Sequence, residues 1–370
     1  MRRLVALALP GGEPFVTELR RAWDAGDAVL PLDPRLPGPS RQRVLDAMRP
    51  SVIVAPDGTT ALDGGRPVDD GDALVVATSG STGEPKGVVL THDAVQASAS
   101  ATSARIGVTA DDVWLACLPL AHVGGLSVVT RALATGNRVV VHDGFEPARA
   151  VSAGATLVSL VPTALARIDP SAFRIIVLGG SRPPADRPAH VLATYGMTET
   201  GSGVVYEGRP LDGVEVRVAA DGEIHLRGPM LLRCYRNDHD PKTADGWLPT
   251  GDLGGITSDG RLFVEGRRGD MVNTGGEKVW PEAVEAVLRR HPDVADAAVL
   301  AEADHEWGQR VTALVVATPG TSPALDALRD FVKIELPAYC APRRLVLVPA
   351  LPRTTLGKLQ RALLPGLLGG

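Results

Sequence analysis

The sequence predicts an α/β protein with a large N-terminal domain of layered α/β sheets, which carries a small β-hairpin or barrel part, and a small α+β C-terminal domain. Short β-branched runs recur through residues 1–265, and an alternating pattern at residues 213–226 indicates an antiparallel hairpin. After residue 270 an amphipathic helix begins a different pattern. A length of 370 residues also favours two unequal domains.

The elements of the large domain follow from the apolar runs at residues 74–77, 138–141, 157–161 and 175–178. Each run is followed by glycines, prolines or a helix-compatible stretch, which is typical of buried strands in α/β layers. The segment 213–226 alternates around the turn Ala220-Asp221-Gly222, and Ser258-Asp259-Gly260 marks a second hairpin. We therefore expect buried strands first and half-exposed hairpins after them.

The small domain is predicted from residues 281–291, where apolar residues recur at helical spacing behind a proline. Further strands are expected at residues 294–301, 311–317 and 344–348, and a second helix at residues 324–335. This order of elements is that of a compact α+β unit.

Composition excludes several classes of function. The formal net charge is −5 and no block rich in Lys or Arg occurs, so neither nucleic acid nor an anionic membrane surface is an expected partner. No apolar run approaches the length of a membrane span, and the run at residues 4–9 is too short for a secretory signal. The three cysteines are widely spaced, so we expect a cytoplasmic protein without disulfides.

Residues 78–87, Thr-Ser-Gly-Ser-Thr-Gly-Glu-Pro-Lys-Gly, form the most informative stretch. Its glycines let the backbone approach an anion, its hydroxyls can donate to phosphate oxygens, and Lys86 adds a mobile charge. The chain has only five lysines against 33 arginines, so a lysine here indicates a specific role. The stretch predicts a phosphate loop, but not a Walker A motif, because Lys86 is followed by Gly87.

Two other motifs carry groups that suit a nucleotide. Residues 195–199, Tyr-Gly-Met-Thr-Glu, offer an aromatic face, a hydroxyl and a carboxylate that can hold Mg²⁺ together with substrate phosphates. Asp252 can accept hydrogen bonds from ribose hydroxyls, and Arg267 lies close to it through the second hairpin. A surface salt bridge is the alternative interpretation of that pair.

Together these motifs resemble those of the adenylate-forming enzymes, which include acyl-CoA synthetases, luciferases and peptide-synthetase adenylation domains. The resemblance covers residues 25–365, roughly. The phosphate loop begins at residue 78, earlier than in most of the family, so the large domain is expected to be shortened at its N-terminal side. Such a compact form looks most like the actinobacterial o-succinylbenzoate–CoA ligases of menaquinone biosynthesis. The further stretches that carry the resemblance are Pro-Leu-Ala-His-Val-Gly-Gly at 119–125, Leu-Gly-Gly-Ser at 178–181, Trp-Leu-Pro-Thr-Gly-Asp-Leu at 247–253, Glu-Gly-Arg at 265–267, Gly-Gly-Glu at 275–277 and Pro-Arg-Thr-Thr-Leu-Gly-Lys at 352–358.

The resemblance implies a role for each matching residue. The implied ATP-binding residues are Thr78, Ser79, Gly80, Ser81, Thr82, Gly83, Lys86, Gly179, Gly180, Ser181, Tyr195, Gly196, Thr198, Asp252 and Arg267. The implied catalytic residues are Lys358, His122, Thr198 and Glu199, with Glu199 holding Mg²⁺ and His122 positioning substrate rather than acting as a base. The implied acyl pocket contains His122, Gly124, Gly125, Thr163 and Gly196, and a second substrate carboxylate would need a cation such as Arg131, Arg167 or Arg182.

The reaction implied by the resemblance uses ATP, Mg²⁺, a small carboxylic acid and coenzyme A. An acyl-adenylate forms first and a thiol then displaces AMP, so a C-terminal domain at residues 269–370 must move on an N-terminal ATP- and acyl-binding domain at residues 1–268. Gly269 is the expected hinge, where many relatives carry Asp or Lys. Other aryl or acyl acid substrates, an acyl-AMP ligase that loads a carrier protein and a non-enzymatic nucleotide-binding relative stay open, as does a homodimer.

Overall fold

The computed structural model describes residues 2–79, 85–353, 357 and 359–369. The chain divides into two compact units, each with its own core. Unit 1 contains residues 1–217 and 225–249, and unit 2 contains residues 218–224 and 250–370. The sequence predicts a different boundary, between residues 268 and 269, which marks where one domain would rotate on the other. That boundary stays a prediction.

The first sheet of unit 1 has seven strands in the order β16-β6-β5-β2-β1-β3-β4. Strand β1 runs parallel to β2 and β3, whereas β5 and β6, which come before and after residues 80–84, form an antiparallel pair. The predicted strand at residues 74–77 lies inside β5. The strands are β1 (Leu4–Leu7), β2 (Ala28–Pro31), β3 (Val52–Ala55), β4 (Gly58–Ala61), β5 (Asp72–Ser79), β6 (Pro85–Thr91) and β16 (Cys234–Tyr235).

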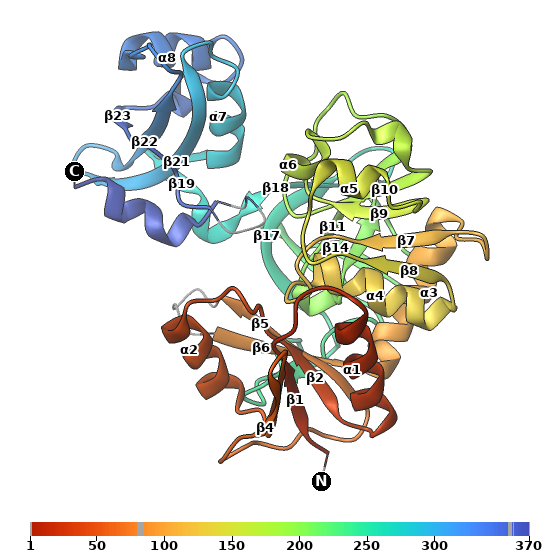
Figure 1. The fold of residues 1–370 in the computed structure, drawn as a ribbon. Helices are drawn as coiled ribbons and strands as arrows, with labels where there is room; N and C mark the ends of the chain where they lie inside the picture. Colours follow the sequence, from red (N-terminus) through yellow and green to blue (C-terminus); the bar gives the residue numbers. More distant parts are fainter. Residues whose placement is uncertain (1, 80–84, 354–356, 358, 370) are drawn as a thin grey trace. The chain divides into compact units, whose positions relative to one another are not determined.

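Both faces of this sheet are covered around β1 and β2, whose residues are buried at every position. Val5 and Leu7 share a core with Phe15 of helix α1 (Glu13–Asp24), whereas Leu4 on the opposite face packs with Met48 of helix α2 (Gly38–Met48). Figure 1 shows α1 and α2 on opposite sides of the sheet. The sheet is therefore an internal layer of unit 1.

The second sheet of unit 1 also has seven strands, in the order β13-β12-β11-β10-β9-β7-β8. Strands β8, β7, β9, β10 and β11 are parallel, and β12 and β13 continue the sheet antiparallel. The predicted strands at 138–141, 157–161 and 175–178 are confirmed as β8, β9 and β10. The bounds are β7 (Val113–Ala116), β8 (Arg138–Val141), β9 (Leu157–Leu160), β10 (Ile175–Leu178), β11 (Val191–Gly196), β12 (Gly203–Tyr206) and β13 (Arg209–Pro210).

Helices cover both faces of this sheet as well. Trp114 and Ala116 pack with Leu126 of α4 (Val123–Thr135) in the core that the two sheets share. On the other face Leu115 packs with Ala164. The remaining helices of the unit are α3 (His92–Ile106), α5 (Pro147–Val151), α6 (Pro162–Leu165) and the short 3-10 turns at Pro170–Ala172 and Thr198–Thr200. The layered α/β architecture expected for the large domain is thus present.

A four-stranded sheet follows in the order β14-β15-β17-β18, and the boundary between the units crosses it. The turn at residues 219–222 connects β14 to β15, and the turn at residues 257–261 connects β17 to β18, as the sequence predicts. The strands are β14 (Glu215–Val218), β15 (Glu223–Arg227), β17 (Leu248–Ile256) and β18 (Leu262–Arg267).

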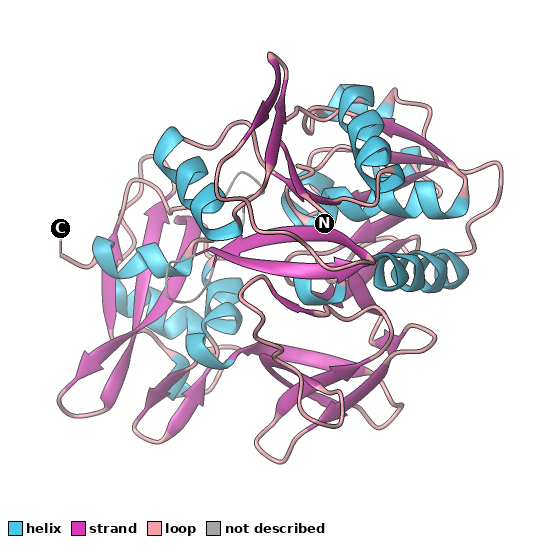
Figure 2. Cartoon of the chain, turned by 90° about the horizontal axis from the view of Figure 1, so that it is seen from below, coloured by secondary structure: helices cyan, strands magenta, loops and turns pink. Residues whose placement is uncertain are grey.

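Unit 2 is built on a five-stranded sheet in the order β20-β19-β22-β21, with β23 added beside β22. Val299 and Val315 on one face pack with Val284 of α7 and Leu328 of α8, and Figure 2 shows this mixture of helices and strands in both units. The predicted elements of the small domain are confirmed. The predicted helices are α7 (Pro281–Leu288) and α8 (Leu325–Lys333), and the predicted strands are β21 (Val294–Asp304), β22 (Gly308–Ala317) and β23 (Arg344–Leu347). Strands β19 (Val272–Thr274) and β20 (Glu277–Val279) and the 3-10 turns at Arg268–Asp270, Ala338–Cys340 and Arg361–Leu367 were not predicted.

No helix in the described part of the chain combines the length and the apolar character that a membrane crossing requires.

Candidate active site

The carboxyl ends of four neighbouring parallel strands collect the residues that the motifs single out. His122 follows β7, Thr163 follows β9, Gly180 follows β10, and Tyr195 lies at the end of β11. Since β7, β9, β10 and β11 run parallel, these positions lie along one edge of the sheet. Ligands of open α/β sheets bind at this edge.

The turn after β10 is built to bring backbone close to a ligand. Gly180 has φ 88°, which only glycine adopts readily, and it is exposed, as is Ser181. The amide of Gly179 donates to the carbonyl of Leu160 at 3.1 Å, which fixes the turn against the end of β9. An exposed, side-chain-free turn at this edge suits the flat purine that the resemblance implies.

Gly196 shapes the segment that carries Thr198 and Glu199. A Cβ at Gly196 would lie 2.2 Å from the carbonyl oxygen of Ser202, so no other residue fits without moving the backbone. The register between β11 and β12 shifts at this position. The buried hydroxyl of Thr200 accepts a hydrogen bond from the Met197 amide at 2.9 Å, which holds the turn that follows. Glu199 is thereby fixed at its backbone while its side chain stays partly exposed.

The predicted phosphate loop connects two paired strands. Thr78 and Lys86 are partners across the β5–β6 ladder, and the Thr78 hydroxyl donates to the Lys86 carbonyl at 3.3 Å. The side chain of Lys86 is exposed, with Nζ 5.5 Å from the centre of the Tyr235 ring. Ser79 ends β5, whereas Gly80, Ser81, Thr82 and Gly83 lie outside the described residues.

Tyr235 is a site residue that the sequence interpretation missed. Its hydroxyl donates to Oε1 of Glu199 at 2.9 Å, while its ring faces Lys86, so it contacts two predicted site residues at once. The available signal was composition, because the chain contains only four tyrosines. Tyr235 comes to this position through the pairing of β16 with β6, which no local pattern reveals.

His122 and its two following glycines begin α4. The His122 carbonyl accepts hydrogen bonds from the amides of Gly125 and Leu126 at 3.1 and 2.9 Å, and the imidazole is exposed. A Cβ at Gly125 would lie 2.3 Å from the Leu118 carbonyl oxygen, whereas Gly124 is less confined. The pKa of Asp33 is lowered chiefly by Arg35 and also by His122, which places a carboxylate in the field of the imidazole.

The three arginines considered for a second substrate carboxylate have different surroundings. Arg131 is buried, lies 4.8 Å from the Trp114 ring centre, and its pKa is lowered by burial. Its Nε and Nη1 atoms have no hydrogen-bond partner among the described residues. Arg167 is exposed beside Phe145, and Arg182 is exposed as well. These surroundings do not single out one of the three arginines as the residue that binds the second substrate carboxylate.

In unit 2, Asp252 and Arg267 are partners across the β17–β18 ladder, as expected from the hairpin. Nε of Arg267 lies 3.1 Å from Oδ1 of Asp252, whose side chain is only 11% exposed, and Nη1 donates to the Thr250 carbonyl at 2.7 Å. Arg267 therefore holds the carboxylate in one orientation while about half of its own side chain remains accessible. This geometry fits either a ribose-binding pair or a structural ion pair.

Gly269 lies in the 3-10 turn at Arg268–Asp270. Its Cβ position meets no atom within 4 Å and its φ is not positive, so neither space nor conformation requires glycine there in this arrangement. Its role as a hinge stays a prediction.

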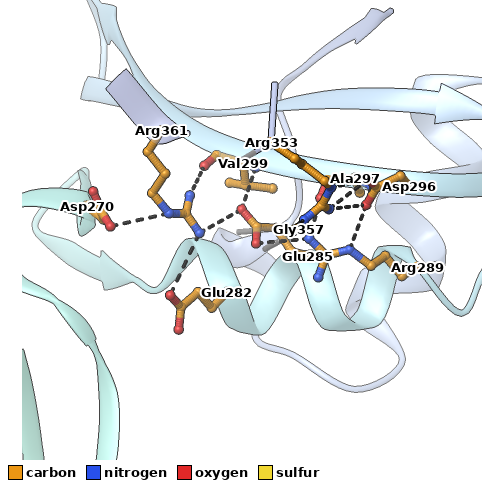
Figure 3. A network of polar contacts seen from close by, with 10 residues as sticks. All are labelled: Asp270, Glu282, Glu285, Arg289, Asp296, Ala297, Val299, Arg353, Gly357 and Arg361. Atoms are coloured by element: carbon orange, nitrogen blue, oxygen red, sulfur yellow. Dashed lines mark hydrogen bonds and ion pairs between the residues drawn. The ribbon is translucent and has the colours of Figure 1, made fainter. Parts of the chain in front are cut away.

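Lys358 lies outside the described residues, but the positions around it are held by two arginines (Figure 3). Arg353 pairs with Asp296 at 2.7 Å and donates to the Gly357 carbonyl at 2.7 Å. Arg353 also forms an isolated antiparallel bridge with Leu359. Arg361 pairs with Glu285 at 2.9 Å and Asp270 at 3.3 Å, lies 3.9 Å from Glu282, and donates to the Val299 carbonyl at 3.0 Å.

The residues present fit a magnesium ion that is shared with a substrate. Mg²⁺ usually binds through one or two carboxylates together with substrate phosphates, rather than in a cage made of protein alone. The described residues contain no group of three or more His, Cys, Asp or Glu side chains arranged to hold a metal. The partly exposed Glu199, oriented by Tyr235, matches the single-carboxylate arrangement.

Comparison with known proteins identifies the family. Residues 66–236 match the AMP-binding enzymes, and residues 283–358 match the C-terminal domain of AMP-binding enzymes. The chain is 40% identical to a probable 2-succinylbenzoate–CoA ligase of Mycobacterium tuberculosis, over 88% of this chain and 93% of that protein. It is 35% identical to the 2-succinylbenzoate–CoA ligase of Bacillus anthracis, over 78% of this chain and 68% of that protein.

Solved structures agree with the sequence relatives. The o-succinylbenzoate CoA synthetase of Bacillus subtilis in complex with the acyl-adenylate intermediate OSB-AMP matches with a TM-score of 0.87 and 28% identity, covering 98% of this chain and 88% of that one. A structure of the same enzyme with ATP and magnesium ion also matches with a TM-score of 0.87 and 28% identity, covering 99% and 90%. The chain belongs to the family of AMP-binding enzymes that includes the 2-succinylbenzoate–CoA ligases.

Proposed function

We propose that this chain is a cytoplasmic, ATP-dependent acid–CoA ligase that activates 2-succinylbenzoate in menaquinone biosynthesis. The observation that carries the proposal is that Lys86 and the Glu199 carboxylate both contact Tyr235. It is supported by the match to the probable 2-succinylbenzoate–CoA ligase of Mycobacterium tuberculosis, which covers 93% of that relative. The three cysteines are free and buried, which is compatible with a reducing compartment.

In the first half-reaction, a carboxylate oxygen of the acid attacks the α-phosphorus of ATP. The bond from that phosphorus to the bridging oxygen breaks, and pyrophosphate leaves with the electron pair. Lys86 and the hydroxyls of the loop would bind the phosphates, Glu199 would hold Mg²⁺, and Lys358 would bridge the attacking carboxylate and the α-phosphate. The metal, when bound, offsets the negative charge on the phosphate oxygens.

The second half-reaction forms the thioester. The sulfur of coenzyme A attacks the acyl carbon, the bond to the phosphate oxygen breaks, AMP leaves with the electron pair, and the thiol proton passes to solvent. His122 positions the acyl group beside the incoming thiol. Lys358 is needed only for the first step, and this difference is the reason to expect rotation about Gly269.

The test is a pyrophosphate-release screen over aryl and aliphatic acids that includes 2-succinylbenzoate. We expect this dicarboxylate to give the highest kcat/KM and a coenzyme A thioester detectable by mass spectrometry. Lys358→Ala should lose pyrophosphate release yet still convert supplied acyl-adenylate. A higher kcat/KM for a monocarboxylic acid would overturn the assignment of 2-succinylbenzoate as the substrate. Acyl transfer to a carrier-protein thiol but not to coenzyme A would overturn the assignment of coenzyme A as the acceptor.

A further inference from the structure

Strand β16 connects the two halves of the phosphate and metal site. Cys234 and Tyr235 pair antiparallel with Val89 and Val88 of β6, the strand that leaves the phosphate loop. Just before β16, the amide of Leu232 donates to the Glu199 carbonyl at 2.7 Å. The segment 232–235 is therefore bonded to β6 through β16 and to the Glu199 turn through Leu232.

The position of β16 is fixed again immediately after Tyr235. The amide of Arg236 donates to the Gly87 carbonyl at 2.7 Å, one residue beyond Lys86. The buried guanidinium of Arg236 donates to the carbonyls of Met48 and Pro67 at 3.0 and 2.8 Å, which anchors this end of the strand. A side chain at position 235 thus has little freedom to shift relative to Lys86 and Glu199.

Tyr235 uses two chemically different parts of its side chain. Its hydroxyl donates to Oε1 of Glu199 at 2.9 Å, and the face of its ring lies 5.5 Å from Nζ of Lys86. An aromatic face attracts an ammonium group, and a phenol donates a charge-assisted hydrogen bond to a carboxylate. One half-buried residue therefore contacts an anion and a cation that serve different parts of the nucleotide complex.

From this geometry we propose that Tyr235 is a positioning residue: its hydroxyl orients the Glu199 carboxylate for Mg²⁺, and its ring orients the Lys86 ammonium for the phosphates of ATP. The proposal rests on the proposed function, in which Glu199 holds Mg²⁺ and Lys86 binds phosphate. It assigns a role to a residue that lies outside the motifs of the sequence.

The hydrogen bond is compatible with metal binding. An ionised carboxylate offers about four lone-pair sites, so Glu199 accepts from Tyr235 and still has an oxygen available for a cation. Carboxylates that ligate metals are usually oriented by such outer hydrogen bonds, and removing the partner typically weakens metal affinity or activity about 10- to 100-fold.

The ring contact also keeps Lys86 available. Among the described residues, Lys86 and Glu199 form no ion pair, although both contact the same tyrosine. In a direct ion pair, the Lys86 ammonium and the Glu199 carboxylate would neutralise each other and be less available to phosphate and Mg²⁺. Because a cation–π contact at an exposed site is weak, phosphate oxygens can draw the ammonium away from the ring when ATP binds.

The experiment separates the hydroxyl from the ring. Tyr235→Phe keeps the ring and removes the donor, so we expect the Mg²⁺ concentration for half-maximal pyrophosphate release to rise at least about tenfold. At saturating Mg²⁺ the KM for ATP should stay within about twofold. Tyr235→Leu should show the same magnesium effect and also raise the KM for ATP about two- to fivefold, since the ring contact is lost.

Two controls keep the result interpretable. Tyr206→Phe removes the hydroxyl of a buried tyrosine of the same unit, 3.4 Å from Thr102, and should leave both constants unchanged. In a Glu199→Gln background, Tyr235→Phe should change the magnesium requirement less than about twofold, because the group that it orients is altered. Full additivity of the two substitutions would overturn the proposal, whatever the stability of the leucine variant.

Failure of this proposal is distinguishable from failure of the proposed function. If the wild-type chain releases no pyrophosphate with any acid, the proposed function fails. Calorimetry of ATP binding at graded Mg²⁺ then still tests Tyr235. An equal magnesium dependence of ATP binding in the wild type and Tyr235→Phe overturns the positioning role, and a shifted dependence supports it.

Discussion

The residue that most directly shapes the Glu199 turn is a glycine. Gly196 faces the Ser202 carbonyl across the β11–β12 pair, with 2.2 Å between its Cβ position and that oxygen. A methyl group there must push the two strands apart, which moves the segment that carries Thr198 and Glu199. The sequence places Gly196 in a motif, but the need for glycine comes from a residue across the strand pair.

We predict that Gly196→Ala lowers the free energy of unfolding by about 1–3 kcal/mol and reduces acid-dependent pyrophosphate release at least about tenfold. Thermal denaturation and initial rates measure the two effects. The matched control is Gly144→Ala in the same unit, whose Cβ position meets no atom within 4 Å and which should change neither quantity. Normal activity in Gly196→Ala would contradict the tight packing of this turn.

Among the elements, the described residues on either side of position 358 are held by ion pairs. Arg353 pairs with Asp296 of β21, and Arg361 pairs with Glu285 of α7 and with Asp270 beside Gly269 (Figure 3). Glu285 is buried, so loss of its Arg361 partner costs more than loss of a partner in an exposed ion pair. Arg353 and Arg361 are therefore both anchored to elements of unit 2.

We expect Arg361→Gln to reduce the adenylation half-reaction about 10- to 100-fold, because the chain that carries the lysine loses its anchor. Conversion of supplied acyl-adenylate to the thioester should stay within about twofold. Arg290→Gln, which removes an exposed pair with Glu335, is the control and should affect neither half-reaction. An equal loss in both half-reactions would point to general damage instead of lost anchoring.

Three strands of unit 2 are joined by hydrogen bonds to one carboxylate, whose ionisation depends on pH. Glu302 of β21 accepts from Arg310 and Thr312 of β22 and from Arg344 of β23. The hydrogen bond from Arg310 is the main cause that lowers the pKa of Glu302 from 4.5 to about 2. A lowered carboxylate pKa stabilises the folded state above the ordinary pKa, and this contribution is lost as pH falls towards the lowered value.

Glu302→Gln should therefore unfold at lower urea concentration than the wild type at pH 7. The difference in the free energy of unfolding should shrink as pH falls from 4.5 to about 2, where the wild-type carboxylate also becomes protonated. Urea titrations of both proteins at several pH values measure it. A constant difference across that range would show that ionisation of Glu302 contributes nothing.

Local patterns predicted most elements, and long-range pairing accounts for what they missed. The strands at 138–141 and 175–178 and the hairpin turn at 258–260 follow from apolar runs and turn residues within a few positions. Tyr235 could not be predicted in this way, because β16 is a two-residue strand whose partner β6 lies far away in sequence. The ion pairs of Arg361 with Asp270 and Glu285 likewise join segments that are distant in sequence. The motifs therefore predicted site residues such as Lys358, but not the ion pairs that hold the neighbouring positions.

At the scale of the whole molecule, the proposed mechanism requires a movement between the two half-reactions. Lys358 is required for adenylation in the proposed mechanism and must leave before the thiol enters. Gly269 has free space around its Cβ position, so the proposed hinge role rests on backbone freedom and not on packing.

We predict that Gly269→Pro, which fixes φ and restricts the preceding residue, spares one half-reaction and reduces the other at least about tenfold. Pyrophosphate release measures adenylation, and conversion of supplied acyl-adenylate measures thioester formation. Circular dichroism checks that the variant is folded. Equal retention of both half-reactions would exclude rotation about this residue.

The measurement that tests the central claim most directly is a crystal structure with ATP and Mg²⁺. It should show the triphosphate along the turn between β5 and β6, the ammonium of Lys86 on a phosphate oxygen, and the metal between Glu199 and the phosphates. A triphosphate bound elsewhere on the protein, with this turn free of nucleotide, would contradict both the assigned site and the mechanism built on it.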